Sequence, residues 1–189
     1  KIKDLISFIR VFNRAPEFYL LENIIDTGFL IADIKLNFDK EGNIKNDYKI
    51  NGFVKDTNID ILKKYKFKKL NFSYEYKNSK LILNNISFLL NDLKLNSKKL
   101  NVNNLQDEFI IRGELNNEES ELSDKNFNLL VKPYLKNLDI DKIQFSSNNK
   151  FSFRISKKFR VKDLVLDSNV ELKRFSLMNK FDLKKIFPN

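Results

Sequence analysis

The side chains that most often carry out catalysis or bind metals are missing from this sequence. Its 189 residues include no His and no Cys, which removes the commonest general base, the thiol nucleophile and two of the usual zinc ligands. Four scattered glycines cannot form a phosphate-binding loop. The segment Asp56–Asp60 starts like a calcium loop, but it lacks the required Gly and the closing Glu, so it predicts a turn. We therefore expect no enzyme activity, no cofactor and no bound metal.

Acidic residues gather in one place, at Glu118, Glu119, Glu121 and Asp124. A pair of carboxyl groups can act as general acid and base when burial separates their pKa values. This cluster lies in a polar stretch over residues 116–125, which favours a solvated loop. Asp139 and Asp141 alternate with apolar residues and are expected on a solvent face.

Cations and aromatic rings interleave over residues 63–69, KKYKFKK. Such a run can grip phosphates and stack bases, or it can meet anionic lipid headgroups. An edge strand protected by lysines is the favoured interpretation. The net charge of +10 fits either a selected attraction to anionic partners or a genome rich in A and T, because Lys, Asn, Ile and Phe are all abundant. A basic nucleic-acid-binding module is the rival class.

Two short amphipathic helices are expected over residues 1–27. Apolar residues recur at helical spacing from Ile2 to Phe12, and Pro16 suits the start of a second helix. Gly28 is a plausible stop. Packing of these helices against a sheet is favoured over binding to a membrane surface, which favours a more basic polar face.

From Gly28 the apolar residues alternate, which predicts half-buried strands. Polar turns at residues 39–43 and at Asn78-Ser79 separate them, and a bulge is expected at Asn84-Asn85. We expect β structure over 28–116 and a linker or crossover over 117–138, where Pro133 would break a central strand. Further strands follow over 139–189. With 42% hydrophobic and 32% charged residues, the chain can bury a core.

An internal repeat is the most informative pattern. The segment DIKLN occurs at 33–37 and DLKLN at 92–96, an offset of 59. Residues 48–54 echo residues 109–115 at an offset of 61, with Gly52 and Gly113 in equivalent places. Such a Gly suggests a bulge or a close backbone approach. Repeated strand units that bury their apolar faces only against their neighbours predict an elongated sheet over this region.

This pattern resembles the AsmA-like superfamily, which includes the large TamB- and YhdP-type proteins of Gram-negative envelopes. The resemblance rests on Gly28–Phe38, Gly42–Val54, Lys69–Tyr76 and Leu81–Leu115, with Asn58–Leu62 in place of the family's helical or loop element. It extends over about residues 1–178, and it rests on pattern rather than on an invariant motif. The chain is poorer in glycine and small residues than many members.

The resemblance implies a mainly β fold, an elongated and curved antiparallel sheet shaped like a taco, with short N-terminal amphipathic helices. Phospholipid acyl chains would slide along its hydrophobic groove between inner and outer membranes. The whole chain would then be a periplasmic fragment of a longer protein, anchored to the inner membrane by a segment outside it. A closed β-sandwich is the structural alternative. Phospholipids are the expected partner, together with membrane surfaces and other envelope proteins, and no nucleic acid is expected.

Alternation places one set of apolar side chains on a common face, and these are the groove candidates. They are Ile34, Leu36, Tyr48, Ile50, Phe72, Tyr74, Phe88, Leu90, Leu93, Leu95, Phe109 and Ile111. The candidates for anionic headgroups are Lys63, Lys64, Lys66, Lys68 and Lys69.

Overall fold

The computed structural model describes residues 1–12, 16–45, 47–61, 63–105, 107–123, 126–128, 132, 140–156 and 160–177. Two helices come first, followed by eight strands. The helices are α1 (Ile2–Phe12) and α2 (Pro16–Ile24). The strands are β1 (Ile25–Lys35), β2 (Lys49–Ile61), β3 (Tyr65–Lys77), β4 (Lys80–Leu90), β5 (Leu93–Asn104), β6 (Glu108–Glu121), β7 (Ile140–Ser156) and β8 (Val161–Leu177).

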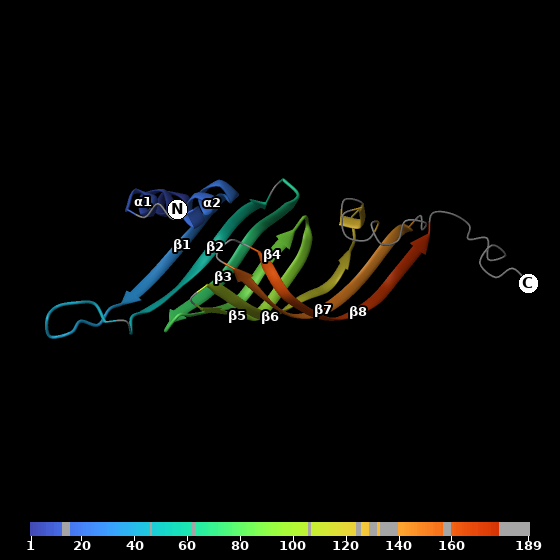
Figure 1. Ribbon diagram of the computed structural model, residues 1–189. Coiled ribbons are helices and arrows are strands. Elements are labelled where there is room, and N and C mark those ends of the chain that lie inside the picture. Colours follow the sequence, from blue (N-terminus) through green and yellow to red (C-terminus); the bar gives the residue numbers. More distant parts are fainter. Residues whose placement is uncertain are drawn as a thin grey trace, which may run out of the picture.

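All eight strands form one antiparallel sheet in sequence order, so every strand pairs with the one before it and the one after it (Figure 1). Among the described strands, only β1 and β8 have a free edge, because each has a single neighbour in the sheet. The expectation of a mainly β, elongated and curved antiparallel sheet with N-terminal helices is confirmed. The closed β-sandwich is wrong, because the described strands make a single open sheet rather than two packed ones.

Tight turns set the register of the central hairpins. Asn78 and Ser79 join β3 to β4, and Asn91 and Asp92 join β4 to β5; all four residues have positive φ. Two consecutive residues in this conformation match the twist of the flanking strands, and Asn and Asp tolerate it best. The turn predicted at Asn78-Ser79 is therefore confirmed. The predicted turn at residues 39–43 is confirmed as well, because Asp39 Oδ1 accepts hydrogen bonds from the amides of Glu41 and Asn43.

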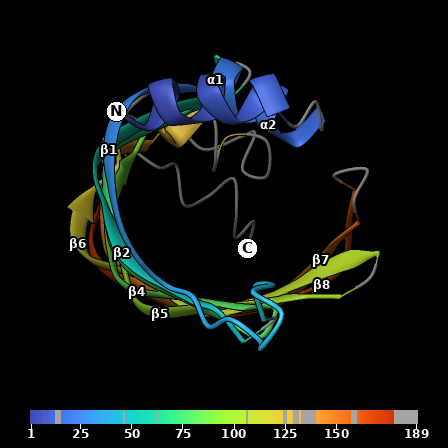
Figure 2. The ribbon, with the colours of Figure 1, turned by 90° about the vertical axis from the view of Figure 1, so that its left-hand side faces the viewer.

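Bulges occur in successive strands and bend the sheet. Asp56 in β2, Lys69 in β3 and Asn85 in β4 each have a φ near +50° at or beside a break in register. An extra residue in one strand bends that strand and increases its twist, so a series of bulges curves the whole sheet. Figure 2, a view along the sheet, shows the strands curving together into an arch that is open on one side. The bulge predicted at Asn84-Asn85 is confirmed.

The helices pack on the apolar face near the β1 edge, as the sequence predicted. Ile2 and Ile6 of α1 are buried against Ile25 and Val54. A short helical turn at 126–128 packs Phe127 on the same face farther along the sheet, where it meets Leu122 and Ile143. The helices and this turn lie on the inner side of the arch (Figure 2), so the apolar face is the concave one.

Gly28 was predicted as a helix stop, and this is wrong. Helix α2 ends at Ile24, and Gly28 lies within β1 with a φ of +144°. A Cβ atom there would come within 2.2 Å of Thr57 Oγ1 and 3.0 Å of Ile2 Cδ1. The glycine is needed for the close packing of α1 on the sheet rather than for a chain reversal.

Three local expectations at polar segments are also wrong. A turn was expected at Asp56–Asp60 and a helical or loop element at 58–62. The described residues of both segments are strand, because β2 continues through Ile61. The predicted loop over residues 116–125 is strand as far as Glu121, because β6 continues its backbone pairing with β7. Lys63–Lys69 does not form an edge strand, because β3 is paired on both sides. In each case pairing between neighbouring strands outweighs local polarity. Half of the crossover predicted over 117–138, and the end of the chain from 178, lie outside the described residues.

Candidate functional site

Apolar side chains on the concave face form rows that run across the sheet from strand to strand. The register places Ile34 of β1 opposite Ile50 of β2 and continues through every strand to β7. This first row contains Ile34, Ile50, Tyr76, Leu81, Val102, Ile111 and Phe153. The second row lies beside the first, two residues away from it on each strand, and extends to β8. It contains Ala32, Gly52, Tyr74, Leu83, Leu100, Gly113, Phe151 and Leu166.

The two glycines of the predicted repeat both lie in the second row. A Cβ on Gly52 would meet the Ile31 carbonyl oxygen at 1.9 Å and the Tyr74 hydroxyl at 2.8 Å. A Cβ on Gly113 would lie 2.6 Å from Leu100 Cδ2. Each glycine therefore lets a large side chain from the neighbouring strand lie flat across it. The close approach predicted for these glycines is confirmed.

The other half of the predicted repeat does not correspond to a structural repeat. Asp33 lies near the end of β1, whereas Asp92 lies in the turn before β5. Gly52 and Gly113 are equivalent because both lie in the second row, on strands β2 and β6, which run in the same direction. The segments 33–37 and 92–96, which are 59 positions apart, do not occupy equivalent places in the sheet.

Most of the predicted groove residues share the concave face. Ile34, Ile50, Tyr74 and Ile111 lie in the two rows, and Phe72 continues the face toward the helices next to Val54. Phe109 follows the same alternation along β6. Leu36 and Tyr48 lie just outside the strands, and the Tyr48 ring is 6.0 Å from that of Tyr76. A hydrogen bond with Tyr76 raises the pKa of Tyr48 above its usual value.

The remaining four predicted residues reach this face only because of bulges. Without one, Phe88 and Leu90 would point away from Leu81 and Leu83, since the two pairs differ by an odd number of positions. The bulge at Asn85 resets the alternation of β4. Phe88 then pairs with Leu95, and Leu90 pairs with Leu93. The Phe88 ring lies 5.4 Å from the Phe67 ring.

The sequence prediction omitted the lining from β7 and β8. Phe151 and Phe153 stack with ring centroids 5.8 Å apart. On β8 the apolar concave side chains are all exposed by about half or more of their area; they are Val161, Leu164, Leu166, Val170, Leu172 and Phe175. Their alternation was visible in the sequence, but the segments on which the resemblance rests end at Leu115.

Polar side chains interrupt the concave face between β5 and β8. The alternation that carries Gly113 and Leu115 places Asn117 on the same side. Asn117 is 2% exposed and donates to the Phe145 carbonyl oxygen. Asn149 donates to the Leu115 carbonyl oxygen and to Ser147 Oγ. The floor in this half is therefore polar but hydrogen-bonded, with apolar strips on either side of it.

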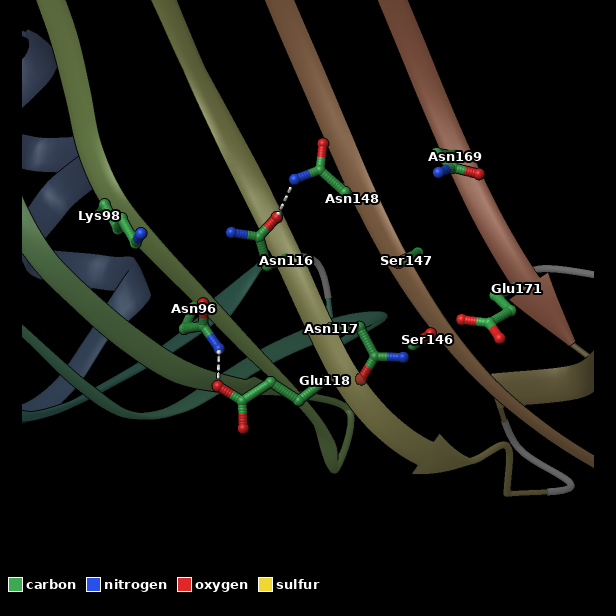
Figure 3. A pocket seen from close by; sticks show the side chains of 10 residues that line it. All are labelled: Asn96, Lys98, Asn116, Asn117, Glu118, Ser146, Ser147, Asn148, Asn169 and Glu171. Atoms are coloured by element: carbon green, nitrogen blue, oxygen red, sulfur yellow. Dashed lines mark hydrogen bonds between the residues drawn. The ribbon is translucent and has the colours of Figure 1, made fainter. Parts of the chain in front are cut away.

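The convex face of the same strands is polar and carries an asparagine ladder. Asn96, Asn116, Asn148 and Asn169 follow one another in register across β5 to β8. Asn148 Nδ2 donates to Asn116 Oδ1 at 2.8 Å, and Asn96 Nδ2 donates to Glu118 Oε1 at 3.2 Å (Figure 3). These side chains line a shallow depression of about 390 Å³. The amides of Asn96 and Asn148 donate to neighbouring side chains, as expected for a solvated sheet surface.

The titratable groups show no arrangement suited to acid–base catalysis within the described residues. A general acid at neutral pH needs a carboxyl group with a raised pKa. Among the described carboxyl groups, Asp39 and Glu171 each have a lowered pKa. Hydrogen bonds from Asn43 lower the pKa of Asp39, and the Lys173 ammonium lowers that of Glu171. The described part of the chain also brings together no cluster of His, Cys, Asp and Glu that could hold a metal ion.

The predicted headgroup lysines lie together at one end of the sheet. Lys63 and Lys64 occupy the turn between β2 and β3, and Lys66, Lys68 and Lys69 follow in β3. Lys66 is 3.6 Å from Asp60, and Lys68 is 3.0 Å from Asp92. The aromatic residues between them are half-buried, and Phe67 faces the concave side, so the run is divided between two faces.

Comparison with known proteins does not assign a family. No protein-family model matches the chain, and no curated protein or solved structure is significantly similar to it. Among the described residues no helix is long and apolar enough to span a membrane. The resemblance to the AsmA-like superfamily therefore stays a prediction.

Proposed function

We propose that the concave face holds the acyl chains of phospholipids, and that this chain is a non-catalytic lipid-binding and lipid-transfer segment of an AsmA-like envelope protein. The observation that carries the proposal is the continuity of two apolar rows across an open sheet. Soluble proteins rarely leave a large connected apolar surface uncovered, and acyl chains are a partner of matching chemistry.

The dimensions of the face suit this ligand. Neighbouring strands lie about 4.8 Å apart, so eight strands give a face roughly 34 Å long. The hydrocarbon core of a bilayer is about 30 Å thick, so one acyl chain extends about 15 Å within its leaflet. The second row, which crosses all eight strands, is long enough for two such chains end to end. Because both rows run across the strands, a chain lying along them would follow apolar residues from strand to strand, and Gly52 and Gly113 are the positions in the second row without a side chain.

The open edges and the exposed β8 lining support transfer rather than permanent storage. The concave side chains of β8 are more exposed than those of β3 and β4, so one end of the face stays accessible. A ligand bound there could exchange with another membrane or with an adjoining protein. Under this proposal the segment functions in the periplasm, between inner and outer membranes, and works with other envelope proteins.

Lipid extraction tests the proposal with a matched pair of variants. Leu100 points to the concave face, whereas Asn101 points to the convex face and pairs with Arg112. We expect phospholipid to co-purify with the wild-type chain and to be detected by mass spectrometry. Leu100→Asp should lose most of it, because an unpaired carboxylate is costly to place among acyl chains, whereas Asn101→Asp should retain it. Equal lipid content in two folded variants, or no lipid in the wild type, would contradict the proposal.

A further inference from the structure

The helices present a second apolar surface, separate from the one that contacts the sheet. Ile2 and Ile6 of α1 are 6% exposed because they pack on β1 and β2. Other apolar side chains of the two helices face solvent, and Val11 and Tyr19 are 71% and 60% exposed. This outer set contains Leu5, Phe8, Val11, Tyr19, Leu20 and Leu21. The apolar stripe of α1 is thus wider than the sheet can cover.

The lysine run lies beside these helices, at the same end of the sheet. Ile25 directly follows α2 and pairs with Ile59 of β2, and Asp60 pairs with Lys66 of β3. Asp26 shares a surface depression with Lys66, Lys68 and Lys69. Both ribbon views place α1, α2 and the β2–β3 turn at the same side of the molecule (Figures 1 and 2). We call this end of the sheet, with α1, α2 and Lys63–Lys69, the helical rim.

Three cations of the helical rim are available for an external partner. Among the described residues, Lys63, Lys64 and Lys69 form no ion pair with a carboxylate, whereas Lys66 and Lys68 do. An exposed apolar helical surface next to lysines that no carboxylate neutralises is the combination that binds the surface of an anionic bilayer. Single-stranded nucleic acid would need open aromatic rings beside the cations on which its bases could stack. Here the Lys64 ammonium covers the Tyr65 ring at 5.1 Å, and Phe67 packs against the Phe88 ring, so a bilayer fits the surface better.

We propose that the helical rim docks on the surface of an anionic membrane. The exposed side chains of α1 and α2 enter the interfacial region, while Lys63, Lys64 and Lys69 contact the headgroups. This docking would bring one end of the arch to the bilayer. It does not depend on whether the concave face carries lipid, so the two proposals can fail separately.

Vesicle flotation of the full chain tests the docking. The probes are vesicles of phosphatidylcholine alone and vesicles that also contain phosphatidylglycerol. We expect binding to the anionic vesicles only, and at least about a tenfold loss in the triple variant K63E/K64E/K69E, because each cation near the surface contributes about 1 kcal/mol. The control K40E/K77E/K80E changes the net charge equally but at the opposite end of the strands, and it should retain binding.

A second pair of variants tests the apolar contribution. Val11→Asp places a charge on the exposed stripe of α1, and Val165→Asp does the same at an exposed position of β8. We expect the first to weaken binding at least tenfold and the second to have little effect. Equal loss in both lysine variants, or no effect of Val11→Asp, would overturn the proposal. Displacement of the protein from vesicles by single-stranded RNA, with K63E/K64E/K69E alone losing RNA affinity, would assign the surface to nucleic acid instead.

Discussion

The packing of α1 on the sheet depends on Gly28, and replacement by Ala should be unusually costly. The new Cβ would lie 2.2 Å from Thr57 Oγ1 and 2.9 Å from Thr57 Cβ, and Thr57 is itself buried. Relief requires β2 or α1 to move, and overpacking of this kind costs about 1–3 kcal/mol. The φ of +144° adds backbone strain of roughly 1–3 kcal/mol for any side chain.

Gly42→Ala separates these two contributions. Gly42 also has a positive φ, of +85°, but a Cβ there would meet nothing within 4 Å. Its replacement should therefore show the strain without the crowding. With a urea m-value of about 2 kcal/mol/M, Gly28→Ala should lower the unfolding midpoint by roughly 0.5–1.5 M more than Gly42→Ala does. Circular dichroism during urea unfolding measures both midpoints. A shift for Gly28→Ala no larger than that for Gly42→Ala would refute the crowding of position 28 against Thr57 and Ile2.

Three further outcomes follow from individual contacts. Asn126 is buried, and its side-chain amide donates to the Asn91 carbonyl oxygen at 2.7 Å. Asn126→Ala should therefore lower the free energy of unfolding by about 1–3 kcal/mol. Asn128→Ala, at an exposed position, should leave it unchanged, and urea unfolding compares the two variants. An NMR titration should give the Asp39 carboxyl group a pKa below its ordinary value of 3.8. The hydrogen bonds to this carboxylate then stabilise the turn fully above pH 3.8, and the stabilisation is lost as the pH falls through the lowered pKa. A pKa above 3.8 would contradict the hydrogen bonds from Asn43. Ile50→Asp on the concave face should lower phospholipid transfer between vesicles at least about tenfold in a variant that stays folded, while Asn51→Asp on the convex face should leave it unchanged.

Alternation alone predicted much of the architecture. A period of two from Leu30 to Phe38, and again in β3 and β6, indicated which side chains share a face, because successive residues of a strand point to opposite sides. The Asn78-Ser79 pair indicated a turn, since Asn and Ser are both common in turns. These features depend on local geometry, which the sequence expresses directly.

The errors came from segments whose structure depends on distant partners. Residues 116–121 are polar enough for a loop, yet they are strand because β7, about 28 positions later, supplies their backbone hydrogen bonds. The lysines of β3 looked like edge protection, but the strand is internal because β4 pairs with its other side. Likewise, the role of Gly28 could not be read from the sequence, because it depends on Ile2 and Thr57 meeting at the same point.

The concave face as a site for acyl chains is tested most directly by photo-crosslinking at two adjacent positions. Phe151 points to the concave face in the second row, and Ser152 points to the convex face opposite Arg112. Because the two positions are neighbours on one strand, they differ in face but hardly in distance from any membrane. A photoreactive residue at position 151 should crosslink to phospholipid in the envelope, and the same residue at position 152 should not. Equal labelling at both positions, or none at position 151, would contradict the proposed function.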